Sequence, residues 1–385
     1  YGLGTTVGAG IYVLVGEVAA TAGSLAPLSF LVAALLASAT AFSFGELSAR
    51  YPKSAGEAVY VNAGFKRAWL AALIGLMVVA VGTISSAAIA NGFAGYARQF
   101  VDLPPWILII GVLILLTAIA VWGITESVTL AAIVRVLEIG GLLLIVAVGA
   151  NAAAKAPLPD FSLGESGLAI GVLGGAVLAF YAFLGFEDMI NVVEETRDPG
   201  RTMPRAIVLT LIVTTVLYIV VAGVAVLVVP IAELAMAEAP LAAVYEHATG
   251  RFPAAIGVIG TVAVINGALV QIIMASRVLY GLARAGWLPK RLAALHPRTQ
   301  TPLFATLLVG GAVMVLAVAL PLVRLAEATS VITLLIFALV NAALWRIKMR
   351  DPAPAGLWCV PLWVPVIGFF SSLGFVIFNI WRHAL

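Results

Sequence analysis

Residues 2–16 read GLGTTVGAGIYVLVG, an apolar stretch that is interrupted near its middle by the tripeptide Gly8-Ala9-Gly10. A second apolar stretch is interrupted in the same way by the tetrapeptide Ala182-Phe183-Leu184-Gly185. Backbone groups that a break frees inside a membrane are costly unless partnered, so breaks occur where the backbone is buried in protein or lines a cavity. The two interruptions therefore predict a buried or cavity-lining position for both segments.

The composition of the chain indicates a membrane protein. Of its 385 residues, 63% are hydrophobic and only 10% are charged, and the mean hydropathy is +1.14. A soluble domain carries roughly 25% charged residues, so a cytosolic enzyme, a disordered protein and a secreted disulfide scaffold are excluded. The single cysteine, Cys359, excludes an internal disulfide and a cysteine metal cluster. We expect neither a metal nor a cofactor.

Apolar runs between polar breaks predict about eleven membrane-spanning helices, since one span needs about 20 apolar residues. The predicted ranges are 1–24, 28–49, 68–97, 104–124, 128–150, 166–193, 204–230, 253–283, 302–320, 322–346 and 358–381. A short surface helix is expected around 236–248. Because the chain begins at Tyr1 inside an apolar run, we expect the start of the first span to be missing.

The distribution of positive charge predicts the orientation. With a cytoplasmic N-terminus, most of the 21 lysines and arginines lie on the cytoplasmic side. The outer side then holds only Arg98, Lys155, Arg251, Arg324 and Arg382. This asymmetry is the positive-inside pattern. We therefore expect a multi-pass protein of the cytoplasmic (plasma) membrane, with the lipid bilayer and not nucleic acid as its surroundings.

The two halves of the chain share an architecture. Each contains an interrupted span and one unusually long span, near 68–97 and 253–283. Helices 1 to 5 map onto helices 6 to 10, and the odd number in each repeat makes the second copy inverted. Paired interrupted spans in an inverted repeat indicate a substrate site near the membrane midplane of a secondary transporter.

Four motifs carry a resemblance to a known superfamily. They are the first stretch quoted above, GELSARYPKSAGEAVYV at 45–61, FYAFLGFEDMINVVEETRDPGRTMPRAI at 180–207 and SRVLYGLARAGWLPKRLAALHPRTQTP at 276–302. In this order they resemble the amino acid–polyamine–organocation superfamily, and within it bacterial amino acid permeases close to the cationic amino acid transporters. The resemblance covers nearly the whole chain.

This resemblance implies an all-α, polytopic membrane protein with a five-plus-five inverted-repeat fold, broken helices 1 and 6, and alternating access. The first repeat would cover 1–150, the second 166–346, and an eleventh helix 358–385. A twelfth helix beyond Leu385 is implied as well.

The first break predicts a site for a carboxylate. The free amides of Ala9, Gly10 and Ile11 stand at the positive start of the outer half-helix, which favours an anion. The resemblance implies that the carbonyls of Thr6, Val7, Tyr181, Ala182 and Leu184 receive an ammonium group. Gly8, Phe183 and Gly185 also belong to the two interrupted segments, and we include them among the expected substrate-binding residues. Together these groups would recognise an α-amino acid by its backbone; alternatively, the glycines serve only close helix packing.

Polar residues in helices 3 and 8 are candidates for the side-chain pocket. They are Thr83, Ser85, Ser86, Asn266 and Gln271. Hydroxyl groups in a span also bond their own backbone, which is the alternative for the first three. Phe183, Phe186 and Tyr181 would form a hydrophobic gate or simply pack.

Ionisable residues inside the spans are functional candidates because they are expensive there. Glu138 lies ten residues into the fifth span, and Arg135 lies one turn earlier on the same face. Relatives of the resembled family often carry a lysine at this position, so the family's coupling ion does not carry over. Glu138 would be a proton carrier or a partner for a cationic side chain; alternatively, it only neutralises Arg135 at i,i+3. Glu187 is expected to have a gating or proton-linked role, and Asp188 to cap the inner half of helix 6.

The leading functional hypothesis is a secondary active transporter for amino acids that works by proton coupling or exchange. The alternative is a polyamine or organic-cation transporter of the same fold, with Glu138 or Glu187 as counter-charge. An enzyme is rejected because the histidines, His247, His296 and His383, lie in loops or at a helix end, where they cannot build a nucleophile or metal centre at depth. A channel is rejected because no filter segment is present.

Overall fold

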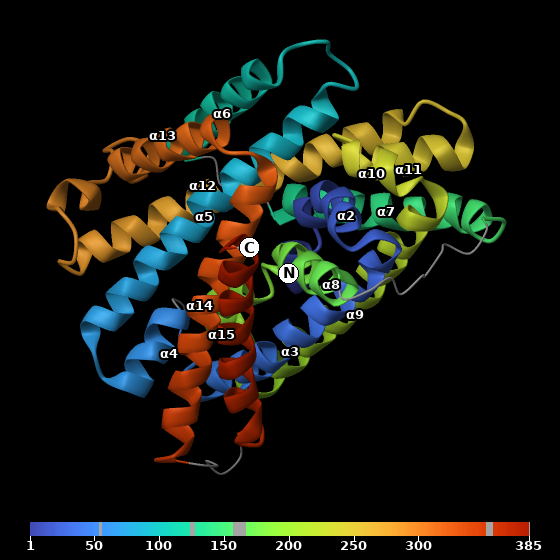
Figure 1. Cartoon of the computed structure of the whole chain (residues 1–385). Coiled ribbons are helices and arrows are strands. Elements are labelled where there is room, and N and C mark those ends of the chain that lie inside the picture. The colour runs from blue at the N-terminus through green and yellow to red at the C-terminus, as the bar shows by residue number, and fades with distance from the viewer. Residues whose placement is uncertain (54–55, 124–127, 157–166, 352–356, 385) are drawn as a thin grey trace.

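The computed structural model describes residues 1–53, 56–123, 128–156, 167–351 and 357–384, and every regular element in these ranges is a helix (Figure 1). Residues 54–55 of the second motif, residue 124 at the end of the fourth predicted span, residue 166 at the predicted start of the second repeat, and Leu385 lie outside these ranges. The elements are α1 (Gly2–Thr6), α2 (Ala9–Ala22), η1 (Gly23–Leu25), α3 (Ala26–Arg50), α4 (Gly56–Phe65), α5 (Ala68–Ala97), α6 (Pro105–Trp122), α7 (Val128–Ala153), α8 (Gly167–Phe183), η2 (Glu187–Glu195), α9 (Pro199–Val228), α10 (Ile231–Met236), α11 (Pro240–Thr249), α12 (Ala254–Arg284), η3 (Lys290–Ala293), α13 (Leu303–Ala319), α14 (Leu322–Lys348) and α15 (Trp363–Ala384).

The chain is a polytopic membrane protein. Within the described ranges, 9 stretches are long and apolar enough to cross a membrane. One of them, Ala9–Arg50, holds both α2 and α3, and α13 is shorter than a usual span at 17 residues. Each of the eleven predicted ranges nevertheless contains a helix within its described residues. The short helix expected around 236–248 is present as α11, and a further short helix, α10, precedes it.

The first interruption lies between α1 and α2. Val7 is extended, with φ −84° and ψ 101°, and Gly8 follows with φ −164° and ψ −145°. The second interruption lies between α8 and η2, where Gly185 has φ 120°. This positive value favours glycine because a side chain would clash with the backbone. Both interruptions fall where the glycine-containing segments predicted them, although the segment after the second one is a 3₁₀-helix.

Helices distant in the sequence pack closely in pairs. The long helices α5 and α12 lie along each other, as do α3 and α9, α2 and α8, and α6 and α13. A Cβ on Gly82 would stand 3.0 Å from Met274 and 3.1 Å from Ala275, so the absent side chain lets α5 approach α12. Small residues permit this kind of contact in membranes.

Two buried carboxylates hold the ends of α14. Near its C-terminal end, Lys348 Nζ donates to Glu46 at 2.9 and 3.0 Å, and Arg50 Nε donates to the same carboxylate at 2.8 Å. Near its N-terminal end, Glu327 accepts from Arg382 and contacts His383, both at 3.0 Å. These contacts fasten α14 to α3 and α15, which stands beside it in Figure 1.

Candidate functional site

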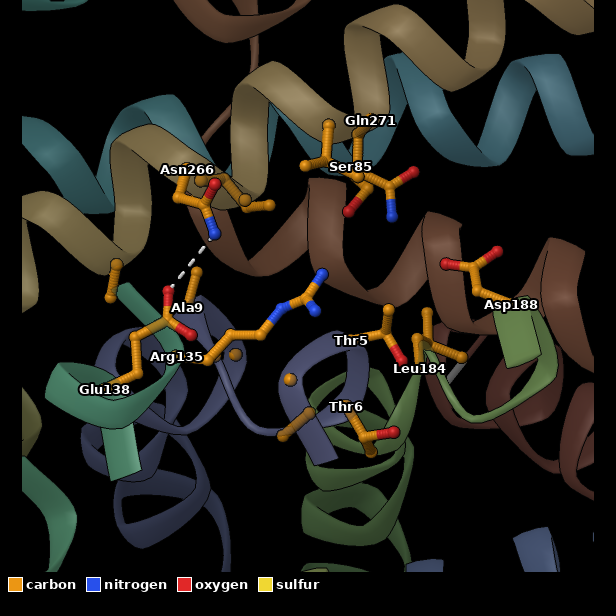
Figure 2. Close-up of a pocket in the computed structure, with 18 of the residues that line it drawn as sticks. Thr5, Thr6, Ala9, Ser85, Arg135, Glu138, Leu184, Asp188, Asn266 and Gln271 are labelled. Carbon is orange, nitrogen blue, oxygen red and sulfur yellow. Dashed lines mark hydrogen bonds between the residues drawn. The ribbon is translucent and has the colours of Figure 1, made fainter. Parts of the chain in front are cut away.

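A cavity of about 90 Å³ lies between the two interrupted helices (Figure 2). Residues of α1, α2, α5, α7, α8, α12 and η2, together with the two interruptions, line it. Among the predicted site residues, the lining includes Thr6, Gly8, Ala9, Gly10, Ser85, Arg135, Glu138, Tyr181, Ala182, Leu184, Asn266 and Gln271. The sequence did not single out the other lining residues Gly4, Thr5, Ile89, Ala263, Gly267 and Val270.

Several predicted residues are not part of the lining. They are Val7, Ile11, Thr83, Ser86, Phe183, Gly185, Phe186 and Glu187. The hydroxyls of Thr83 and Ser86 donate to backbone carbonyls of their own helix at 2.7 and 2.8 Å, as the alternative interpretation had it. Ile11 and Phe183 are fully buried by packing.

The backbones of the two interrupted helices touch. A Cβ on Gly10 would lie 2.6 Å from Cα of Ala182, and a Cβ on Gly185 would overlap the carbonyl oxygen of Thr5. Only glycine leaves room for either approach. The glycines therefore serve close packing, and this packing brings both interruptions to one cavity.

Tyr218 of α9 reaches both interruptions. Its hydroxyl lies 2.8 Å from the carbonyl oxygen of Thr6 and 3.0 Å from that of Ala182, close enough to donate to either. Sequence reasoning missed this residue. A tyrosine inside an aliphatic span was the available signal, because a buried hydroxyl usually finds a partner.

The two acids at the start of η2 lie in its first turn, as expected, and have different surroundings. Glu187 accepts a hydrogen bond from the Gly185 amide at 2.8 Å and so closes the turn after α8. Asp188, for which capping was expected, lines the cavity. Whether Glu187 also takes part in gating stays a prediction.

Arg135 and Glu138 enter the cavity from α7 and point to different parts of it, as Figure 2 shows. Glu138 is 2% exposed, and its carboxylate accepts from Asn266 Nδ2 at 3.5 Å. A Cβ on Gly8 would lie 4.0 Å from this carboxylate, so Glu138 stands beside the start of α2. The Arg135 guanidinium lies 5.2 Å from the centre of the Tyr1 ring.

The α5 and α12 side of the cavity is polar. The Tyr181 and Ser85 hydroxyls lie 2.8 Å apart, and Tyr181 also donates to the Ser85 carbonyl at 3.1 Å. Two buried amide oxygens, Asn266 Oδ1 and Gln271 Oε1, have no hydrogen-bond partner in the described part of the chain. Buried polar atoms of this kind are rare unless water or a ligand satisfies them.

A second cavity of about 770 Å³ lies between α4, α5, η2 and α12. It shares Asp188 and Val270 with the first cavity, so the two adjoin. Its walls are mostly apolar, with Glu57, Asn191 and Arg277 as further polar residues. The linings of the two cavities together extend from the interruptions to α4.

Membrane helices that are interrupted beside an internal polar cavity define the class as a membrane transport protein. The particular family follows from comparison: the chain belongs to the amino acid permease family, whose sequence model matches residues 2–383. As a member of a transporter family, it is not an enzyme.

Three relatives illustrate the range of this family. The chain is 29% identical to the branched-chain amino acid permease of Bacillus subtilis, over 98% of this chain and 86% of that protein. It is 30% identical to the vacuolar cationic amino acid transporter 4 of Arabidopsis thaliana, over 91% of this chain and 62% of that protein. It is 28% identical to the methylthioribose transporter of Bacillus subtilis, over 96% of this chain and 84% of that protein.

Gly185→Ala tests the contact between the interruptions. The positive φ and the overlap with Thr5 should lower the free energy of unfolding by roughly 1–3 kcal/mol. The matched control is Gly111→Ala in α6, where a Cβ meets no atom within 4 Å and alanine should add up to about 1 kcal/mol. Both are measured by unfolding of the purified protein in detergent. Equal stabilities of the two variants would contradict the contact.

Glu57 of α4 predicts a pH dependence of stability. Burial, and then the charge of Asp188, raise the pKa of Glu57 from 4.5 to about 7. Because the folded pKa lies above the unfolded one, the stabilisation is present at low pH and is lost as pH rises through about 7.

Thermal unfolding measured from about pH 5.5 to about pH 8 should show this loss, and Glu57→Gln should remove that part of it. The control is Glu246→Gln, at an exposed position of α11. Parallel profiles of wild type and Glu57→Gln would show that Glu57 does not titrate in this range.

Proposed function

We propose that this protein is a secondary active transporter that carries an α-amino acid across the membrane by alternating access, with the substrate bound at the paired interruptions. The observation that supports this most directly is the cavity of about 90 Å³ between them, on which the ends of the four half-helices α1, α2, α8 and η2 converge. The amide oxygens of Asn266 and Gln271, without partners in the described residues, support a polar ligand there.

The proposed pose follows from the helix ends. The substrate carboxylate lies at the amides of Ala9, Gly10 and Ile11, where the positive end of α2 favours an anion. The ammonium group faces the carbonyls at the ends of α1 and α8, namely those of Thr6, Val7, Tyr181, Ala182 and Leu184. Each carbonyl oxygen has two lone pairs, so Thr6 and Ala182 can accept from the substrate as well as from Tyr218.

The proposed fold is the five-plus-five inverted repeat, with repeats at 1–150 and 166–346 and a further helix at 358–385. Helix lengths in matching positions support it. The helices α5 and α12 have 30 and 31 residues, α6 and α13 have 18 and 17, and α7 and α14 have 26 and 27. The first helix of each proposed repeat is the interrupted one.

We further propose a plasma-membrane location with the N-terminus in the cytoplasm, on the strength of the positive-inside pattern. In this orientation α4, which joins the second and third spans, lies on the cytoplasmic side. The cavity of about 770 Å³ beside α4 is then the inner approach to the substrate site.

A second candidate cargo is a polyamine or other organic cation. The observation that favours it is the charge of the lining, which among the described residues holds two carboxylates, Glu138 and Asp188, and one guanidinium, that of Arg135. An amine without a carboxylate would use these acids and leave the amides of α2 unoccupied.

Uptake by the protein in proteoliposomes distinguishes the two cargoes. A labelled amino acid mixture is competed by single unlabelled amino acids and by putrescine, with and without an inward proton gradient. Competition by α-amino acids alone supports the proposal and identifies the substrate. Transport of putrescine alone overturns the role of the α2 amides, and the effect of the gradient separates proton coupling from exchange.

Glu138→Gln tests whether Glu138 carries a coupled proton. The amide keeps the size of the side chain and a bond to Asn266, but it cannot exchange a proton. Gradient-driven uptake should therefore become independent of pH, whereas the exposed control Glu246→Gln keeps the wild-type pH profile. An unchanged profile for Glu138→Gln would show that Glu138 carries no coupled proton.

A further inference from the structure

The cavity of about 770 Å³ combines an apolar wall with charges of both signs. Its apolar lining residues include Ile74 and Val78 of α5 and Ile273 and Met274 of α12. Among the described residues, its charged lining consists of Arg277 of α12, Glu57 of α4 and Asp188 of η2. A ligand that fits this cavity should therefore carry an apolar group together with charged groups.

The two carboxylates belong to elements that pack against each other. Glu57 lies in the first turn of α4, and a Cβ on the neighbouring Gly56 would overlap the Ile190 side chain of η2. Asp188 lies in the first turn of η2. The contact between α4 and η2 therefore brings both carboxylates to one wall of the cavity.

Arg277 reaches the cavity from a different wall. Its side chain is exposed, and in the described part of the chain no ion pair joins it to Glu57 or Asp188. The guanidinium and the carboxylates thus line one cavity without direct pairing. Charges between apolar walls act on a ligand more strongly than charges in bulk water do. A ligand with an anionic group and a cationic group matches this arrangement.

The charged residues of this cavity begin at the smaller cavity between the interruptions. Both cavities share Asp188 and Val270 as lining residues. Arg277 follows Val270 by seven residues of α12, which is two helical turns or about 10 Å along the helix axis. A molecule that leaves the smaller cavity past Asp188 therefore enters the space that Arg277 lines.

We propose that the larger cavity holds a second binding site, for an α-amino acid with an apolar side chain, in which Arg277 binds the carboxylate and Asp188 the ammonium group. Glu57 adds negative charge beside Asp188, and the aliphatic residues of α5 and α12 receive the side chain. That this ligand is also the cargo rests on the proposed function. Because Asp188 lines both cavities, the ammonium group then keeps one partner while the cargo moves between them.

Equilibrium binding of labelled L-leucine to the protein in lipid nanodiscs tests the second site. Wild type should bind two molecules per protein. In Arg277→Gln the affinity for one of them should fall by at least about tenfold, the worth of one charge-assisted hydrogen bond. The matched control is Arg284→Gln, on the same helix, also exposed and outside both linings, which should bind as wild type does.

Two analogues of leucine test whether both charged groups are recognised. Isoamylamine lacks the carboxylate, and isocaproate lacks the ammonium group. Neither should displace the Arg277-dependent leucine at concentrations at which unlabelled leucine does. Displacement by either analogue as effective as that by leucine would overturn the assignment of a zwitterion site.

The second site and the proposed function can fail separately. If no bound leucine depends on Arg277, or if Arg284→Gln loses the same molecule, the inference is wrong, and uptake alone decides the proposed function. If leucine binding depends on Arg277 but the wild type transports no amino acid, the second site stands and the proposed function fails.

Discussion

The structure depends on one constraint: backbone groups inside a membrane must find partners within the protein. Two helices are interrupted, and several of the freed backbone groups find partners within the protein. Gly185 donates its amide to Glu187, and Leu184 donates its amide to the Tyr181 carbonyl at 3.2 Å. The Tyr218 hydroxyl serves the Thr6 and Ala182 carbonyls. The cavity lies between the two interruptions, beside these hydrogen bonds, so its position follows from the interruptions and from the contacts that hold them together.

The sequence offered two explanations for the glycines, close packing and substrate binding. The structure shows the close packing, and the proposed substrate binding depends on it. Because Gly10 lies against Ala182 and Gly185 against Thr5, the ends of four half-helices converge on a volume of about 90 Å³. With larger residues there, the same helix ends would stand apart and each would need a partner of its own.

Helices and interruptions could be predicted from the sequence because their signals are local. A run of apolar residues or a glycine segment is visible within one span. The Tyr218 bridge, the cavity position of Asp188 and the turn-closing bond of Glu187 depend on which helices are neighbours. Helices that are apolar on all sides give no periodicity from which to read a face. The sequence therefore indicated which residues lie at the interruptions but not which third helix supports them.

A buried carboxylate is not by itself enough to locate the cavity between the interruptions. Glu46, Glu138 and Glu327 are all at most 4% exposed, yet only Glu138 lines the cavity. Glu46 accepts from Arg50, Lys348 and the Val360 amide, and Glu327 is held by Arg382 and His383. Both are enclosed by cationic or amide donors at the ends of α14. Glu138 instead lies at the cavity, beside the start of α2 and the side-chain amide of Asn266. Glu138 differs from the other two buried carboxylates in that its neighbours include open volume, which only the assembled helices define.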